Sequence, residues 1–287
     1  MSRLSPPTGS DMSRLALLLV SAIGLAACSS AGTGSAGPDV ARELPVAVAT
    51  TRTAPETVPS PGQQMVASAF EEAVGVLVGG DGVRLTFEGA EEGYVTTGWV
   101  EMDLRTGEFH STEDELYDTG ERIRSEFILV GDEIHARLAH GGAELGDLDW
   151  TVEPVEPALR QEFVDEALTL TGRGGGSLER IVRYLNELPF DVIDLGRSEV
   201  GERTSTGRQV IFEAADISQL LRMNGLELVG PSDPPGQTYY EFWVDEATGA
   251  LTRLALAGVQ FHDGEALEGF GGRIDYEVSV IDLDAPG

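Results

Sequence analysis

The sequence predicts an α+β fold, in which a large antiparallel sheet curls into a half-open barrel and a few helices cover one of its faces. Three observations support this prediction. Apolar and polar residues alternate over many short segments, glycine-containing turns join several of these segments into hairpins, and two further segments have helical apolar spacing. Hairpin-linked strands interrupted by occasional helices are typical of α+β proteins. A sheet this long tends to curl, and helices that plug a curled sheet enclose an apolar cavity.

The first predicted element of the folded part is a helix over 63–77, which a glycine-rich segment ends. Strands are predicted wherever alternation is strict, and the Gly131-Asp132 and Thr248-Gly249 pairs are typical hairpin turns. The residues at helical spacing in the first helix are Met65, Ala69, Ala73 and Val76. The predicted strands are 83–87, 98–104, 124–130, 134–138, 192–200, 209–213, 239–245, 250–256 and 274–283.

Two more amphipathic helices are predicted between the strands. Pro157 stands at the first position of one, which continues to Leu170, and Ser177 caps the other, which Pro189 ends. Each has a wide apolar face that must pack against the sheet or another helix. A short helix is expected near 216–223. The inward residues of the helix after Ser177 are Leu178, Ile181, Val182, Leu185 and Leu188.

The N-terminus has the features of a bacterial lipoprotein signal peptide. Arg14 precedes a short apolar run, and Leu25-Ala26-Ala27-Cys28 matches the lipobox, in which the cysteine sulfur receives a diacylglyceryl group and the chain is cut before it. The run is too short to favour a transmembrane helix. A plain secretory signal with an accidental cysteine is the alternative, and Met12 is a candidate start. We therefore expect a palmitate-bearing lipid on Cys28 and a cell-membrane location on the extracytoplasmic face.

Residues 28–62 are predicted to be a tether, and 63–287 a single folding unit. The tether is rich in Gly, Ser, Pro and Thr and lacks periodicity, and its root-mean-square reach is about 30 Å if flexible. The unit after it is long enough to bury a substantial core. Residues 1–27 are the expected signal peptide. Cys28 is the only cysteine, so the mature domain has neither a disulfide nor a cysteine nucleophile.

The charge of the chain excludes nucleic-acid partners. The formal net charge is −30, and removal of residues 1–27, which carry Arg3, Arg14 and Asp11, makes it −31. A field of this sign repels phosphates. Every basic residue is Arg, and the sequence contains no Lys. An acidic surface of this density suits a salt-tolerant source or an arginine-biased genome, and the sequence does not distinguish the two.

No constellation of catalytic or metal-binding residues stands out. His135 and His140 are five residues apart, which is not the spacing of a helical metal-binding pair, and surface histidines are the better interpretation. The glycines of 172–176 precede a helix, but no phosphate-loop lysine accompanies them, so a connecting loop is favoured. The sequence lacks a G-x-S-x-G motif. We therefore predict a protein that is not an enzyme and needs no cofactor.

Several segments resemble the LolA/LolB-type carrier fold and, more closely, the actinobacterial cell-envelope lipoproteins of the LppX/LprG type. The resemblance rests on the lipobox and on the order and spacing of hydrophobic residues in the folded part. It implies a half-open barrel that holds the acyl chains of lipids or lipoglycans. The strongly acidic balance departs from the family pattern and argues against anionic glycolipids. The similar segments are the lipobox at Cys28, the helix 63–77 with 83–89, the hairpin 127–134, the pair 240–245 and 251–254, and the terminal 282–286.

The leading hypothesis is a membrane-tethered carrier for lipid or lipoglycan acyl chains, acting as a monomer. The alternative is an acidic structural or sensor lipoprotein with a solid core, which docks onto another envelope protein. Alternating apolar residues in a sheet are often plain core, and a void of several hundred Å³ between sheet and helices would separate the two hypotheses. The residues expected to line the cavity are Leu85, Phe87, Val100, Met102, Ile134, Phe242, Val244, Tyr276 and Val278.

Overall fold

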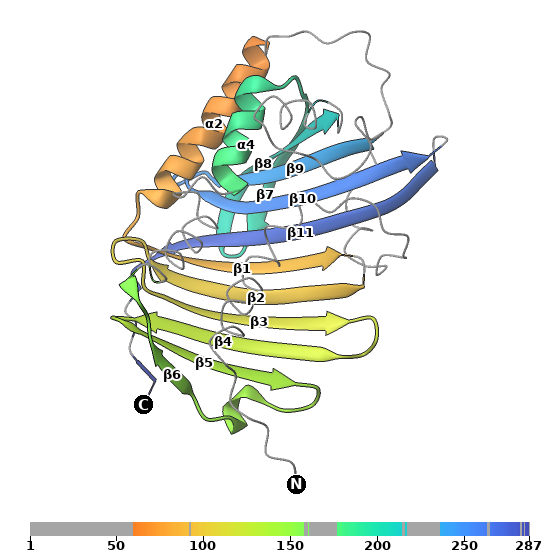
Figure 1. Cartoon of the computed structure of the whole chain (residues 1–287). Helices are drawn as coiled ribbons and strands as arrows, with labels where there is room; N and C mark the ends of the chain where they lie inside the picture. The colour runs from red at the N-terminus through yellow and green to blue at the C-terminus, as the bar shows by residue number, and fades with distance from the viewer. Residues whose placement is uncertain are drawn as a thin grey trace.

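An antiparallel sheet with two helices on one face forms the body of the protein (Figure 1). The computed structural model describes residues 60–287 except 92, 158–159, 161–176, 214–215, 217–235, 263–264, 282, 284 and 287. The helices among the described residues are α2 (Pro61–Val78), α4 (Ser177–Glu187) and the 3₁₀ turn η2 (Leu145–Asp147). The strands are β1 (Gly82–Glu91), β2 (Tyr94–Asp103), β3 (Phe109–Tyr117), β4 (Arg122–Val130), β5 (Glu133–His140), β6 (Thr151–Pro154), β7 (Asp191–Val200), β8 (Arg203–Glu213), β9 (Gly236–Asp245), β10 (Leu251–His262) and β11 (Glu265–Ser279).

All eleven described strands belong to one sheet, and every pairing is antiparallel. The order across the sheet is β6-β5-β4-β3-β2-β1-β11-β10-β9-β8-β7, so the first and last strands of the fold pair at its centre. The sheet is open and not strongly curled, with β6 and β7 as its edges. The expected large antiparallel sheet is confirmed, whereas its closure toward a half-barrel is not. The short edge strand β6 ends at Pro154, which has no N–H to extend the pairing.

Local sequence explains where α2 begins and how it is held. Ser60 caps it, because its side-chain oxygen accepts from the Gln63 N–H at 3.3 Å while the Gln63 side chain accepts from the Ser60 N–H at 2.6 Å. Pro61 occupies the first turn, where a missing N–H costs nothing. The Gln63 side chain also donates to the carbonyl of Phe190, which ties α2 to the segment after α4.

The two helices pack together over the β9–β10 part of the sheet (Figure 1). Phe70 of α2 meets Phe242 of β9 edge-on, with ring centroids 5.0 Å apart. Tyr184 of α4 packs against Phe212 of β8 at 6.1 Å. Aromatic contacts of this geometry stabilise a core by about 0.5–1.5 kcal/mol each beyond their buried area. Burial confirms the predicted apolar face of α4, in which Val182 is half-buried and these residues are buried: Leu178, Ile181, Leu185 and Leu188.

The sheet has an inner face, which α2 and α4 cover in part, and an outer face. Successive side chains of a strand point to opposite faces. On β1, Leu85 and Phe87 are buried on the inner face, whereas Arg84 and Thr86 are exposed on the outer face. At Gly98 of β2 the ring of Phe87 lies so close that an added Cβ would come within 2.5 Å of it, so glycine is required there.

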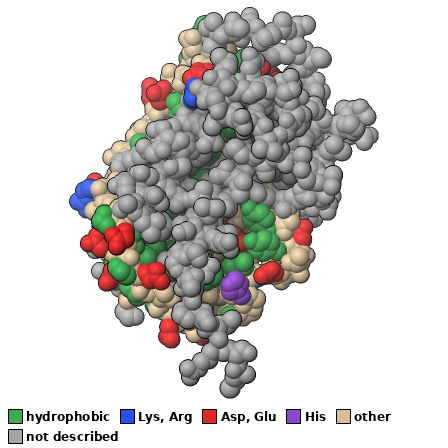
Figure 2. Space-filling model, in the orientation of Figure 1, with side chains coloured by type: hydrophobic (Ala, Val, Ile, Leu, Met, Phe, Trp, Pro, Cys, Tyr) green, Lys and Arg blue, Asp and Glu red, His purple; other side chains and the backbone are tan. Residues whose placement is uncertain are grey.

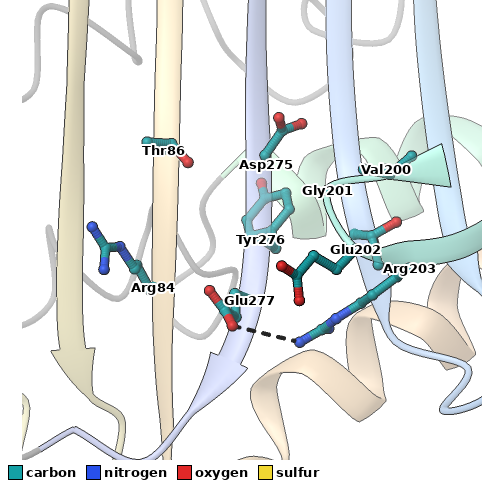
Figure 3. A pocket seen from close by; sticks show the side chains of 10 residues that line it. Arg84, Thr86, Val200, Gly201, Glu202, Arg203, Asp275, Tyr276 and Glu277 are labelled. Carbon is teal, nitrogen blue, oxygen red and sulfur yellow. Dashed lines mark ion pairs between the residues drawn. The ribbon is translucent and has the colours of Figure 1, made fainter.

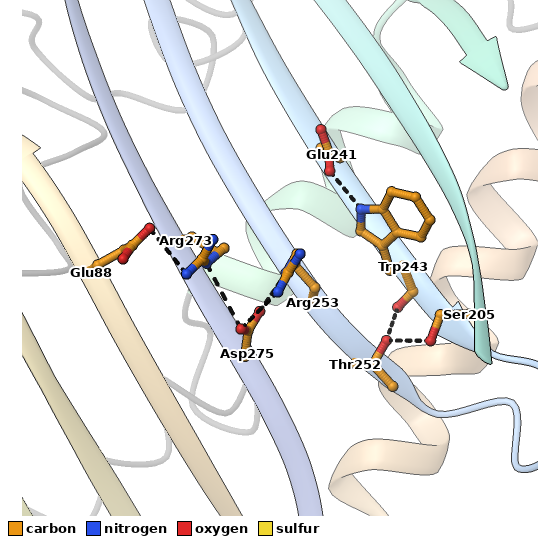
Figure 4. A network of polar contacts seen from close by, with 8 residues as sticks. All are labelled: Glu88, Ser205, Glu241, Trp243, Thr252, Arg253, Arg273 and Asp275. Atoms are coloured by element: carbon orange, nitrogen blue, oxygen red, sulfur yellow. Dashed lines mark hydrogen bonds and ion pairs between the residues drawn. The ribbon is translucent and has the colours of Figure 1, made fainter. Parts of the chain in front are cut away.

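Charged side chains on the outer face join neighbouring strands (Figure 4). Arg253 of β10 donates to both oxygens of Asp275 on β11, at 2.5 and 2.9 Å. Arg273 lies 3.2 Å from Glu88 of β1 and 3.8 Å from Asp275, so the network spans three strands. Beside it, the indole N–H of Trp243 donates to Glu241. Partly exposed networks of this kind add modestly to stability and fix the register of the strands.

Some predicted elements differ in the structure. Of the residues predicted to face inward on α2, Ala73 is buried, but Met65 is 74% exposed and Val76 is also exposed. Strand β11 ends at Ser279, and Val280, which was expected to continue it, is 86% exposed. Strands β3 and β6 were not predicted. The helix expected over Pro157–Leu170 and the one near 216–223 lie almost wholly outside the described residues.

Candidate functional site

The nine residues expected to line a cavity come together on the inner face, in one apolar cluster. Seven are buried, and the other two, Val244 and Val278, are half-buried and pack against the cluster. The cluster runs from β5 across the centre of the sheet to β8. The seven buried residues are Leu85, Phe87, Val100, Met102, Ile134, Phe242 and Tyr276.

The inner face changes character along the strands. Register places the side chains of β11, β1, β2, β3, β4 and β5 in rows that run across the sheet. The row next to the end of α2 is wholly apolar: Val278, Val83, Met102, Phe109, Leu129 and Ile134. The second row introduces two hydroxyls: Tyr276, Leu85, Val100, Ser111, Phe127 and Ala136.

The next two rows are increasingly polar. The third consists of Ile274, Phe87, Gly98, Glu113, Ser125 and Leu138. The fourth consists of Gly272, Gly89, Thr96, Glu115, Ile123 and His140. No arginine occupies any position in the four rows. The inner face of β1–β5 therefore has an apolar end beside α2 and a polar end at the opposite ends of the strands.

Two buried carboxylates characterise the polar end. Glu113 is 9% exposed and Glu115 is 5% exposed, and both belong to β3. The hydroxyl of Thr96 donates to Glu113 at 3.1 Å, and the hydroxyl of Tyr117 donates to Glu115 at 2.7 Å. Burial, reinforced by repulsion from Glu115, raises the pKa of Glu113 to about 7, although the Thr96 hydrogen bond opposes the shift.

Two buried hydroxyls beside this end have no hydrogen-bond partner among the described residues. Ser111 is 3% exposed and precedes Glu113 by two positions, so its Oγ lies on the same face. The hydroxyl of Tyr276 lies in the same row as Ser111. Burial raises the pKa of Tyr276 above its usual range, so this side chain stays neutral. Buried polar atoms without partners are uncommon and call for an explanation.

A separate pocket of about 660 Å³ lies on the outer face (Figure 3). It lies between the turn that joins β7 to β8 and the strands β1 and β11. Arg203, the first residue of β8, approaches Glu277 of β11 to 3.9 Å, and Arg84 of β1 pairs with Glu101 of β2 at 3.1 Å. Its lining is mostly polar and includes one of the nine predicted residues, Tyr276. It is therefore not the void predicted between sheet and helices.

Acidic side chains outnumber basic ones on the described part of the surface in Figure 2, as the composition predicts. Among the described residues, no three His, Cys, Asp or Glu side chains gather as metal ligands. None of the described helices has the length and apolar character needed to cross a membrane. Cys28, the expected lipidation site, and the glycines of 172–176 lie outside the described residues.

No protein-family model matches the sequence, and no curated protein matches it. Solved structures do match. The lipoprotein LppX from Mycobacterium tuberculosis is 12% identical, with a TM-score of 0.43 over 77% of this chain and 99% of that one. LprF from Mycobacterium bovis is 12% identical, with a TM-score of 0.46 over 80% and 99%. An uncharacterised conserved protein from Thermus thermophilus is 9% identical, with a TM-score of 0.29 over 76% and 90%.

The similarity to LppX that the sequence indicated is thus confirmed as a match between structures. At these identities and TM-scores it assigns neither a ligand nor a family to this chain. The polar end of the inner face was not predicted from the sequence. All five residues from Ser111 to Glu115 are polar, so no apolar alternation indicated that this segment forms a strand with a buried face.

Proposed function

We propose that this chain is a membrane-anchored, extracytoplasmic lipoprotein that binds the acyl chains of a lipid or lipoglycan against the inner face of its sheet. The observation that carries the proposal is the extent of the inner-face apolar cluster. It continues from β9 and β10, where α2 packs, across β1 to β5. Burial of acyl surface against such a face is favourable by about 25 cal/mol per Å².

The N-terminal motif supports the same proposal. A lipid on Cys28, together with the expected tether of residues 28–62, would keep the sheet close to the bilayer that supplies acyl chains. The two valines Val244 and Val278 are half-buried at the border of the cluster. The binding step requires no cofactor and no covalent chemistry, because desolvation of apolar surface is sufficient to drive it.

A second candidate, an acidic docking lipoprotein with a solid core, is favoured by one observation. The seven buried cavity candidates lie in a packed cluster, while the pocket of about 660 Å³ is on the outer face. In that case the outer face would receive another envelope protein, and the inner face would only stabilise the fold.

Bound lipid distinguishes the two candidates. The full chain, purified in a mild detergent from membranes of its own cells, is expected to release a defined lipid in about one-to-one ratio when the complex is dissociated and analysed by native mass spectrometry. Membrane protein of similar abundance, purified in parallel, controls for lipid carried by the micelle. A lipid profile identical to that of the control would support the solid-core candidate and contradict the carrier.

Cys28→Ser tests the anchor. The serine has no sulfur to receive the diacylglyceryl group, so the variant is expected to remain an uncleaved precursor and to lose palmitate labelling. The measurement is radiolabelled palmitate incorporation and the apparent mass of the product in membrane fractions. Ser29→Ala, one residue further on, is the matched control and should be processed normally. Normal labelling of Cys28→Ser would contradict the lipobox assignment.

A further inference from the structure

The rows of the inner face change from apolar to polar along the strands, and this change would orient a bound lipid. The row beside α2 contains apolar side chains alone, whereas polar side chains gather on β2–β4 at the other end of the strands. The binding free energy of an acyl chain is most favourable where no polar group is desolvated with it. The binding free energy of a polar head group is most favourable where hydrogen-bonding side chains can replace the water around it.

The chemistry of the polar end discriminates between head groups. Glu113 and Glu115 are buried carboxylates, and no arginine shares their rows. A phosphate placed beside them would meet like charge in a site of low dielectric constant, where repulsion is strong. Hydroxyl groups, in contrast, donate to carboxylates and bear no charge.

The unpartnered hydroxyl of Ser111 is an independent observation that points to a ligand. Its Oγ is buried without a partner among the described residues, one row from Glu113 on the same face. Ser125, which pairs with Glu113 across β3 and β4, adds another buried hydroxyl. Serine hydroxyls both donate and accept, so they match ligand hydroxyls better than they match an ammonium group, which only donates.

We infer that the bound lipid lies along the strands, with its acyl chain toward α2 and its head group at Glu113 and Glu115, and that the head group carries hydroxyls and no phosphate. This inference rests on the proposed function and makes it more specific. The ligand hydroxyls would supply donors to the two carboxylates and a partner to Ser111, which offsets the cost of burying these groups.

The test uses two lipids that share one acyl chain. The full chain in a mild detergent is mixed with equal amounts of 1-oleoylglycerol and 1-oleoylglycerol 3-phosphate, and native mass spectrometry counts the two adducts. We expect the glycerol adduct to exceed the phosphate adduct by about tenfold or more, because of like-charge repulsion at the two carboxylates. An equal ratio, or an excess of the phosphate lipid, would overturn the inference and leave the carrier proposal intact.

Variants of the two glutamates test whether they cause the preference for the lipid without phosphate. Glu113→Gln and Glu115→Gln, singly and together, are expected to bring the ratio of the two adducts toward one, since each removes charge while keeping side-chain size. Glu71→Gln, on the exposed side of α2, removes one charge elsewhere and should leave the ratio unchanged. The single variants keep the test decisive if the double variant does not fold. A ratio unchanged in both singles would overturn the assignment of the head-group site. Failure of the unmodified chain to bind either lipid would overturn both the inference and the carrier proposal.

Discussion

Val100→Trp is expected to abolish acyl binding while the domain remains folded. Val100 is 2% exposed and occupies the middle of the inner face, in the row between the apolar and polar ends. If acyl chains bind along this face, an indole at this position takes the space of the chain. The measurements are adduct formation with 1-oleoylglycerol by native mass spectrometry and the urea midpoint by circular dichroism.

The size of the stability change separates a carrier from a solid core. A carrier should lose the adduct with a change in the free energy of unfolding below about 1 kcal/mol, whereas overpacking of a solid core typically costs about 1–3 kcal/mol. Val152→Trp, on the exposed edge strand β6, is the matched control and should change neither measurement. Val278 is a poorer probe, because its Cγ1 lies 2.9 Å from the position that a Cβ on Gly80 would take.

Local signals in the sequence predicted two of the hairpins, the one between β4 and β5 and the one between β9 and β10. The turn between β4 and β5 contains Gly131 with a φ of 56°, and the turn between β9 and β10 contains Gly249 with a φ of 74°. Glycine adopts these left-handed conformations without steric cost, so the residue type itself marks the turn. Asp245 strengthens the second turn, since its carboxylate accepts from the Ala247 N–H and the Thr248 hydroxyl.

The arrangement of the strands was not predictable in the same way. The pairing of β1 with β11 joins Gly82 to Ser279, and nothing local in either strand specifies such a distant partner. The buried side of α2 was predicted only in part, at Ala73, for a related reason. Apolar residues surround most of that helix, so helical spacing fits both the predicted set and the observed one, and only packing against β9 and β10 selects Phe70 and Leu77.

The part of the candidate site that was not predicted lies on strand β3. Its inner-face residues after Phe109 are Ser111, Glu113 and Glu115, and an alternation without apolar residues does not indicate a buried strand. The apolar part of the candidate site followed from pattern, because Val83, Leu85 and Phe87 alternate with polar residues on β1, as Val100 and Met102 do on β2. The polar part of the site depends on buried glutamates. Glutamate side chains are rarely buried in proteins, so these positions were not expected to face inward. The polar side chains from which we infer a head-group preference are thus ones that an alternation pattern assigns to solvent.

Glu113→Gln is expected to stabilise the protein, and to do so only at higher pH. The pKa of Glu113 is raised to about 7 by burial and by Glu115, against 4.5 for an ordinary glutamate. Below pH 4.5 the Glu113 carboxyl is protonated in both the folded and the unfolded chain, so its burial does not lower the free energy of unfolding. Between pH 4.5 and 7 the unfolded chain loses its proton first, and stability falls as pH rises. Above pH 7 Glu113 is charged in both states, and its burial lowers the free energy of unfolding by about 3 kcal/mol, at 1.36 kcal/mol per pKa unit.

Glutamine has no proton to lose over this range and still offers an oxygen to the Thr96 hydroxyl, so the variant keeps the hydrogen bond and avoids the cost of charge. The difference in free energy of unfolding between the variant and the unmodified chain, from urea denaturation, should grow from near zero at pH 4.5 toward about 3 kcal/mol at pH 8. Because both proteins share every other carboxylate, the titrations of groups distant from Glu113 cancel in this difference. Glu71→Gln, on exposed α2 surface, should give a small difference that is flat with pH. A flat difference for Glu113→Gln as well would mean that Glu113 ionises as it does in water, and would remove the low-dielectric surroundings from which the discrimination against phosphate is argued.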